Sequence, residues 1–165
     1  MAYLSDIQLR NMGFKRLGKD VKISDKASVY NPESISIGDN SRIDDFCVIS
    51  GVLNIGRNVH ITPLCLVAGG DVGIEFEDFS ALAYRVTVFT QSDDYSGKYM
   101  TNPTVPNCYT KCTARKVKVG KHSIIGANTV VFPGTIIGEG VSIGANSSVQ
   151  GRIKKWGIYG GTPLQ

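Results

Sequence analysis

The sequence has few of the residues that mark several functional classes. Its 165 residues include only two histidines, four cysteines and one tryptophan. No apolar run approaches the about 18 residues that a transmembrane helix needs, so we expect no membrane-spanning segment. The N-terminus, Met-Ala-Tyr-Leu-Ser-Asp, lacks the basic and apolar regions of a signal peptide. These absences predict a cytoplasmic protein whose thiols are reduced.

A large charge of one sign is also missing. The chain has 18 Lys and Arg against 14 Asp and Glu, a net charge of +4. This surplus is too small to predict a nucleic-acid partner, and it suits an anionic cofactor equally well. Hydrophobic residues make up 42% of the chain and charged residues 19%, so the protein can bury a core and is not disordered.

The first 20 residues predict a short helical cap. Ser5 and Gln8 form a capping-box pattern, and the apolar residues that follow give one small face that ends at Gly13. We therefore predict an N-terminal helical cap over residues 1–20 and a second domain over residues 21–165.

Beyond the cap, aliphatic residues recur with a period of six. The repeating positions are Ile37, Ile43, Ile49, Ile55, Ile61, Val67, then Phe76, Leu82, Val88, and then Val119, Ile125, Val131, Ile137, Ile143 and Val149. Four places after each, the residue is usually small or aliphatic. Neither helical spacing nor strict alternation gives this pattern. Hexads predict an all-β parallel β-helix, in which three hexads close one coil and coils stack about 4.8 Å apart.

The period is interrupted twice. Three extra residues enter between Val67 and Phe76, and the pattern is lost altogether from residue 90 to residue 115. The second segment is polar and aromatic, and two prolines punctuate it. Long loops on rigid scaffolds are where binding residues concentrate, so we predict that this loop contributes to the functional site. The alternative is a spacer that only covers one flank of the β-helix.

The run from Val119 to Ser147, VGKHSIIGANTVVFPGTIIGEGVSIGANS, resembles the C-terminal coils of the hexapeptide-repeat acyltransferases. It is most similar to the galactoside, maltose and nodulation acetyltransferase group and to polysaccharide O-acetyltransferases. Gly-Gly-Thr-Pro near the end resembles their terminal turn. The resemblance implies a left-handed β-helix, a homotrimer with active sites between subunits, and acetyl-CoA as the donor.

Acyl transfer to a hydroxyl needs a general base, and histidine suits that role. We predict that His60 is this base, at an outward corner within reach of a neighbour's long loop; the alternative is a plain surface histidine. The family carries its catalytic histidine at the start of the long loop, where this sequence has Asp93. Either His60 is the base and Asp93 or Asp94 orients it or binds the sugar, or Asp93 is itself the base.

Other residues of the loop suit a carbohydrate acceptor. Asp94, Tyr95 and Asn102 offer hydrogen bonds and a flat apolar ring. We predict that they bind the substrate, although they would serve equally well to pack the loop against the β-helix.

For the donor, the resemblance carries Ala127 and Ala145 onto family positions where small side chains let the pantetheine arm lie close to the backbone. Gly126 and Gly144 precede them, and Lys154 follows the last coil, where a cation would meet the CoA phosphates. A solvated lysine is an equally good interpretation of Lys154.

The cysteines do not predict a metal site. Cys47 and Cys65 lie one full coil apart, so both should point inward as buried thiols. Cys108 and Cys112 have C-x3-C spacing in the long loop, but zinc would need two further ligands. The two histidines are also too few for a zinc hydratase of the γ-carbonic-anhydrase kind, which needs three per metal.

We therefore predict an acetyl-CoA-dependent acetyltransferase that modifies a sugar hydroxyl, acting in surface-polysaccharide biosynthesis without a metal. The alternative acceptor is the amino group of a nucleotide-linked amino sugar, because a neutral amine attacks with less help from a base. A trimeric scaffold without enzyme activity is a third possibility, and it would bind no CoA.

Overall fold

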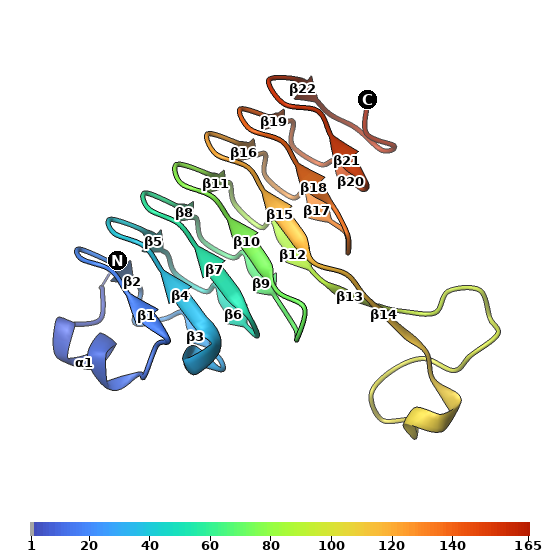
Figure 1. Cartoon of the computed structure of the whole chain (residues 1–165), viewed down its shortest axis with the longest axis horizontal. Helices are drawn as coiled ribbons and strands as arrows, with labels where there is room; N and C mark the ends of the chain where they lie inside the picture. The colour runs from blue at the N-terminus through green and yellow to red at the C-terminus, as the bar shows by residue number, and fades with distance from the viewer. Residues whose placement is uncertain (1) are drawn as a thin grey trace.

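The structure, a computed structural model, describes residues 2–165 and forms a left-handed parallel β-helix of about seven coils (Figure 1). Three parallel sheets make its three faces. The first face contains β1 (Arg16–Leu17), β4 (Ile35–Ile37), β7 (Leu53–Ile55), β10 (Ile74–Phe76), β15 (Val117–Val119), β18 (Ile136–Ile137) and β21 (Arg152–Ile153). The second face contains β2 (Lys22–Ile23), β5 (Arg42–Ile43), β8 (His60–Ile61), β11 (Ala81–Leu82), β16 (Ile124–Ile125), β19 (Ser142–Ile143) and β22 (Ile158–Tyr159). The third face contains β3 (Ser28–Val29), β6 (Val48–Ser50), β9 (Leu66–Ala68), β12 (Thr87–Phe89), β17 (Val130–Val131) and β20 (Ser148–Val149).

The hexads set this architecture, as the sequence predicts. Each repeating aliphatic residue ends or lies within a strand and is buried, so the core is one apolar column inside the coils. The buried corner positions are small because they fill tight space, and their hydroxyls bond to the adjacent coil. The Ser41 Oγ donates to the Gly56 carbonyl at 2.7 Å, and the Ser123 Oγ donates to the Gly138 carbonyl at 2.8 Å. Corners therefore leave few buried polar groups unsatisfied.

The N-terminal segment covers the open end of the first coil. Ser5 is the N-cap of helix α1 (Asp6–Asn11), and its capping box with Gln8 is present as predicted. Leu9 of this helix is buried and joins the core, so it shields the first coil from water. Strand β1 already pairs with β4 of the first face, so the β-helix begins inside the segment predicted as the cap.

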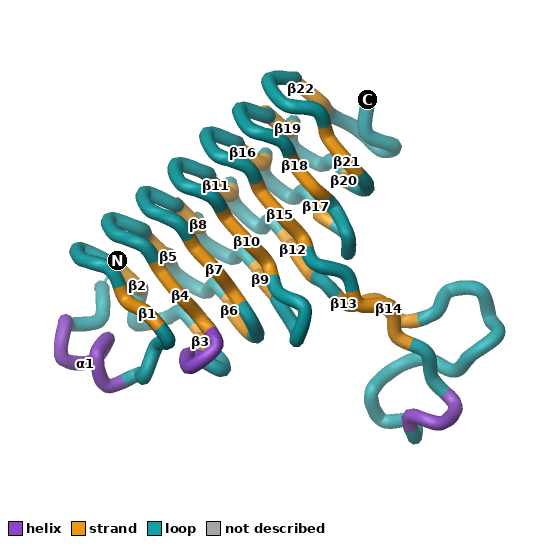
Figure 2. The backbone as a smooth tube through the Cα atoms, viewed as in Figure 1, coloured by secondary structure: helices purple, strands orange, loops and turns teal. Residues whose placement is uncertain are grey.

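The long excursion is a separate structure that projects from the β-helix (Figure 2). Its base is an antiparallel pair, β13 (Gln91–Asp93) with β14 (Cys112–Ala114), and it contains one short 3-10 helix, η2 (Asn107–Tyr109). The other 3-10 helix, η1 (Pro32–Ser34), lies in the coils between β3 and β4. Thr90 is buried where the excursion leaves the third face, and its Oγ1 donates to the Gly69 carbonyl at 2.7 Å. The base is therefore fixed to the coils, while residues 94–111 are exposed or half-buried.

All four cysteines are free. Cys47 and Cys65 are buried in neighbouring coils, as predicted, and their thiols donate to the carbonyls of Thr62 at 3.1 Å and Ala83 at 3.2 Å. The hydrogen bond with Cys65, followed by burial, raises the pKa of the Cys47 thiol, which stays protonated. Between residues 2 and 165, the structure has no helix with the length and apolar character to cross a membrane.

Candidate active site

The candidate catalytic residues His60 and Asp93 belong to different parts of the chain. His60 opens strand β8 on the second face, whereas Asp93 ends strand β13 of the excursion, which leaves from the third face. Each has its own hydrogen-bond partners, and no hydrogen bond or ion pair joins the two within residues 2–165.

The His60 side chain points outward, as the hexad register predicts, and it is 41% exposed, but it lies in strand β8 and not at the predicted coil corner. Parallel pairing places it between Arg42 of β5 and Ala81 of β11. Its Nε2 lies 2.8 Å from Oδ2 of Asp44, a carboxylate only 1% exposed. The neighbour on the other side, Ala81, has a small side chain, and the imidazole is partly open to solvent. An imidazole oriented by a buried carboxylate is an arrangement typical of a general base.

Asp44 is held from two sides. The Arg42 guanidinium donates from Nε to Oδ1 at 2.6 Å and from a terminal nitrogen to Oδ2 at 2.9 Å. Burial alone would raise the pKa of the Asp44 carboxyl, but hydrogen bonds from Arg42 and His60 outweigh burial and hold this pKa below its ordinary value. The carboxylate is therefore ionised at neutral pH and fixes the imidazole in one orientation.

The hexad pattern alone does not single out Asp44. It follows the inward Ile43, where a solvated corner residue is the ordinary expectation. The coil period nevertheless contained the information, since it places Arg42 directly beside His60. The carboxylate that contacts His60 within the chain is therefore a residue of the coils.

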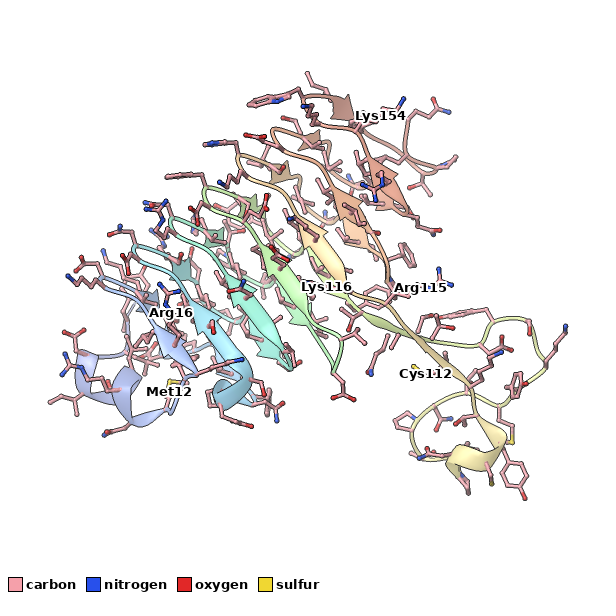
Figure 3. The ribbon with its side chains drawn as sticks, viewed as in Figure 1. Met12, Arg16, Cys112, Arg115, Lys116 and Lys154 are labelled. Carbon is pink, nitrogen blue, oxygen red and sulfur yellow. The ribbon has the colours of Figure 1, made fainter. Side chains whose placement is uncertain are left out.

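Asp93 lies at the base of the excursion with an exposed side chain. Its Oδ2 accepts a hydrogen bond from the backbone N–H of Asn102 at 3.0 Å. Cys112 is its cross-strand partner in β14, and Figure 3 shows Cys112 in the projecting hairpin. An exposed carboxylate with one neutral donor is available to accept a proton or to bind a hydroxyl or an amine.

The predicted substrate-binding residues lie on the same excursion. The Asp94 carboxylate accepts from the Ser96 hydroxyl at 2.7 Å, and Tyr95 is 93% exposed. The side-chain oxygen of Asn102 accepts from the backbone N–H and the hydroxyl of Thr104. The excursion thus brings Asp93 and Asn102 together, whereas the Tyr95 ring faces solvent rather than the β-helix.

Four of the predicted donor-binding residues stack at one corner, between the second and third faces. Gly126 and Ala127 follow β16, Gly144 and Ala145 follow β19, and the Asn146 N–H donates to the Ala127 carbonyl at 2.8 Å. A side chain on Gly126 would meet the Ala145 nitrogen at 2.5 Å, so the next coil requires this glycine. Gly144 has ordinary space around it and, like Ala145, is exposed. This corner suits an extended ligand such as the pantetheine arm lying along the backbone.

Lys154 lies at a different corner. It follows β21, where the chain turns from the first face to the second, near the C-terminal end of the β-helix (Figure 3). The second face separates it from the stacked glycines and alanines. A single CoA that contacts both places must therefore cross that face. The described residues contain no group of three or more His, Cys, Asp or Glu that could hold a metal.

Comparison with known proteins links these features to acyltransferases. Residues 116–150 match the family model described as the hexapeptide repeat of succinyl-transferase. The whole chain is 45% identical over 169 aligned residues to dTDP-4-amino-4,6-dideoxy-D-glucose acyltransferase of Escherichia coli, of which the match covers 87%.

Solved structures agree with this match. AntD, an N-acyltransferase from Bacillus cereus in complex with dTDP and 3-hydroxybutyryl-CoA, superimposes with a TM-score of 0.96 at 44% identity, covering 99% of this chain and 87% of that one. A serine-to-cysteine variant of AntD, in complex with dTDP-4-amino-4,6-dideoxyglucose and coenzyme A, superimposes with a TM-score of 0.97 at 46% identity. The match covers 99% of this chain and 87% of that one. A maltose O-acetyltransferase from Clostridium difficile shares only the fold, with a TM-score of 0.59 at 21% identity over 98% of this chain and 75% of that one.

Proposed function

The chain belongs to the hexapeptide-repeat acyltransferases, and from this we propose that it transfers an acyl group from acyl-CoA to the amino group of a dTDP-linked amino sugar. The observation that carries the proposal is the similarity to two amino-sugar acyltransferases along the entire chain, at 44–46% identity. The O-acetyltransferase of the same fold is far more distant. This favours the amine as the acceptor over the sugar hydroxyl.

The residues of the excursion fit an amine better than a hydroxyl. In the reaction the amine nitrogen attacks the thioester carbonyl carbon, the carbon–sulfur bond breaks, and CoA leaves as a thiol that takes up the proton given by nitrogen. An aliphatic hydroxyl needs a strong base because it attacks while its proton leaves. An amine needs only a group that accepts its proton, and the exposed Asp93 carboxylate can do this.

We assign the donor to the corner made by Gly126, Ala127, Gly144 and Ala145, with Lys154 meeting phosphate groups across the second face. The small side chains leave the backbone of this corner accessible to the donor. Our proposed donor is acetyl-CoA, as the resemblance to the acetyltransferases implies. Asp94 and Tyr95 are proposed to hold the sugar nucleotide beside Asp93. We place the reaction in the cytoplasm, on precursors of a surface polysaccharide.

The active unit is proposed to be a homotrimer. Exposed apolar residues gather at the corner between the second and third faces and on the third face itself, where Val48 pairs with Leu66. The group consists of Phe46, Val48, Leu64, Leu66 and Tyr84, each between 37% and 61% exposed. A contiguous apolar surface of this kind marks an association site, and closed symmetric assembly is the usual outcome.

The direct test gives the purified protein acetyl-CoA and one of two matched acceptors. The first is dTDP-4-amino-4,6-dideoxyglucose, and the second is the same nucleotide sugar with a hydroxyl in place of the amine. We expect thiol release and an amide product with the first acceptor only. Ester formation on the second acceptor at an equal or higher rate would overturn the proposal.

One observation favours sugar O-acetylation as the second candidate. The His60–Asp44 pair has the form of an oriented general base, which a hydroxyl acceptor requires. In that case His60 is the catalytic base and Asp93 binds the sugar. The matched acceptors separate the two functions without any substitution.

A further inference from the structure

The Asp93 carboxylate is fixed by a residue from the far side of the excursion. Its Oδ2 accepts the backbone N–H of Asn102, nine positions along the chain, at 3.0 Å. Both residues are exposed, and neither is packed against the β-helix. An exposed side chain on a strand end otherwise samples several rotamers. The Asn102 N–H is therefore what restricts the carboxylate to one orientation.

Asn102 can present its N–H because its own conformation is unusual. Its φ is +75°, in the left-handed region that asparagine tolerates far better than most residues. The side-chain oxygen then accepts the Thr104 backbone N–H at 2.9 Å and the Thr104 hydroxyl at 2.6 Å. This turn stabilises the left-handed backbone locally. The side-chain oxygen of Asn102 is thus used for loop geometry.

From this geometry we infer that Asn102 is a positioning residue, which holds the Asp93 carboxylate toward the acceptor amine through its backbone N–H. The inference rests on the proposed function, because it needs Asp93 to accept the proton. It differs from a role in binding the sugar, in which the Asn102 side chain would contact the acceptor itself. A positioning role acts on turnover, whereas a sugar contact acts on the KM of the acceptor.

Three substitutions at this position separate the possibilities. Asn102→Ala removes both the tolerance for positive φ and the side-chain oxygen, and we expect kcat to fall by about tenfold to a hundredfold. Asn102→Gly keeps the backbone freedom and should lose less. Asn102→Asp keeps the oxygen and tolerates the left-handed conformation, but it loses the side-chain NH2 and adds a negative charge; measured at raised ionic strength, which screens that charge, it should retain most of kcat. Asn107→Ala, at an exposed asparagine of the same excursion, is the matched control with unchanged kinetics.

The decisive measurement is a double-mutant cycle with Asp93→Asn. If Asn102 acts through Asp93, Asn102→Ala lowers kcat in the wild-type background and has no further effect when Asp93 is already replaced. An equal fold-loss in both backgrounds would show a general role in loop folding and overturn the inference. Should Asp93→Asn fall below detection, Asn102→Asp decides: near-wild-type kcat and acceptor KM support positioning, and a raised acceptor KM contradicts it. Activity of the wild-type protein tests the proposed function separately.

Discussion

Asp44 and Asp93 lie in two different kinds of structure. Asp44 is in the coils, 1% exposed, with a guanidinium and an imidazole bound to its oxygens. Asp93 is on the excursion, exposed, with a single backbone N–H as its partner. A buried carboxylate held by a guanidinium and an imidazole has little capacity to accept a proton, whereas an exposed one held by a single backbone N–H keeps it. We therefore propose that Asp44 has a structural role in the coils and that Asp93 of the excursion accepts the proton.

The largest effect should follow from removing the excursion. Gln91 and Ala114 are cross-strand partners, so residues 92–113 can be replaced by a two-residue Asn-Gly turn. The coils do not depend on these residues, and we expect the β-helix to keep its circular-dichroism spectrum. Amide formation should fall by at least about 10³-fold, because Asp93 and the proposed sugar contacts are lost. Retained activity would move the chemistry to the coils, and an unfolded product would show that the two regions are not independent.

A smaller effect is expected from Asp44→Asn, which should lower the free energy of unfolding. Breaking a fully buried ion pair costs roughly 3–5 kcal/mol; here we expect about 2 kcal/mol, because Arg42 and His60 are partly exposed. The folded-state pKa of Asp44 is lowered, so its contribution is present above the unfolded pKa of about 4 and is lost as the pH falls through the folded value.

Urea unfolding at pH 7 and at pH 3 measures this difference. The gap between wild type and Asp44→Asn should shrink at pH 3. Asp78→Asn is the control. It removes the carboxylate that pairs with Arg57, which is more exposed than Asp44, so it should cost less stability at pH 7. A gap of the same size at both values of pH would contradict the assigned charge pair.

The smallest effect distinguishes two glycines at the donor corner. Gly126→Ala places a methyl 2.5 Å from the Ala145 nitrogen, so we expect about 1–3 kcal/mol of destabilisation. Gly144→Ala meets no atom closer than 3.5 Å and should leave the melting temperature unchanged. If this corner holds the donor, Gly144→Ala raises the KM for acyl-CoA severalfold without loss of stability. An unchanged KM would place the donor elsewhere.

The sequence predicted the coils in detail because one residue class repeats at one spacing. Phe76 and Val119 belong to consecutive coils although the whole excursion separates them in the chain, and the hexads locate both in the core. The glycines and alanines of the donor corner also stack as the period requires. A repeat of this kind determines which residues point inward, so burial needs no other information.

The excursion and the Asp44 pair were harder to predict for physical reasons. Asn102 meets Asp93 through a backbone N–H and a left-handed turn, neither of which has a period in the sequence. The hexad period places Arg42 beside His60, but it does not show that both side chains turn toward the carboxylate of Asp44. The position of Lys154 was also hard to predict, because the corner at which it lies is known only once each strand is assigned to a face.

The most direct test compares the importance of Asp93 and His60 for turnover. It measures kcat of the two single variants with dTDP-4-amino-4,6-dideoxyglucose as the acceptor. We predict that Asp93→Asn lowers kcat by about 10²–10⁴-fold, the usual range for losing a general base, while His60→Ala lowers it by less than about threefold. Both proteins should keep their CoA affinity and oligomeric mass. A large loss for His60→Ala with near-normal turnover for Asp93→Asn would contradict the account and return the catalytic role to the coils.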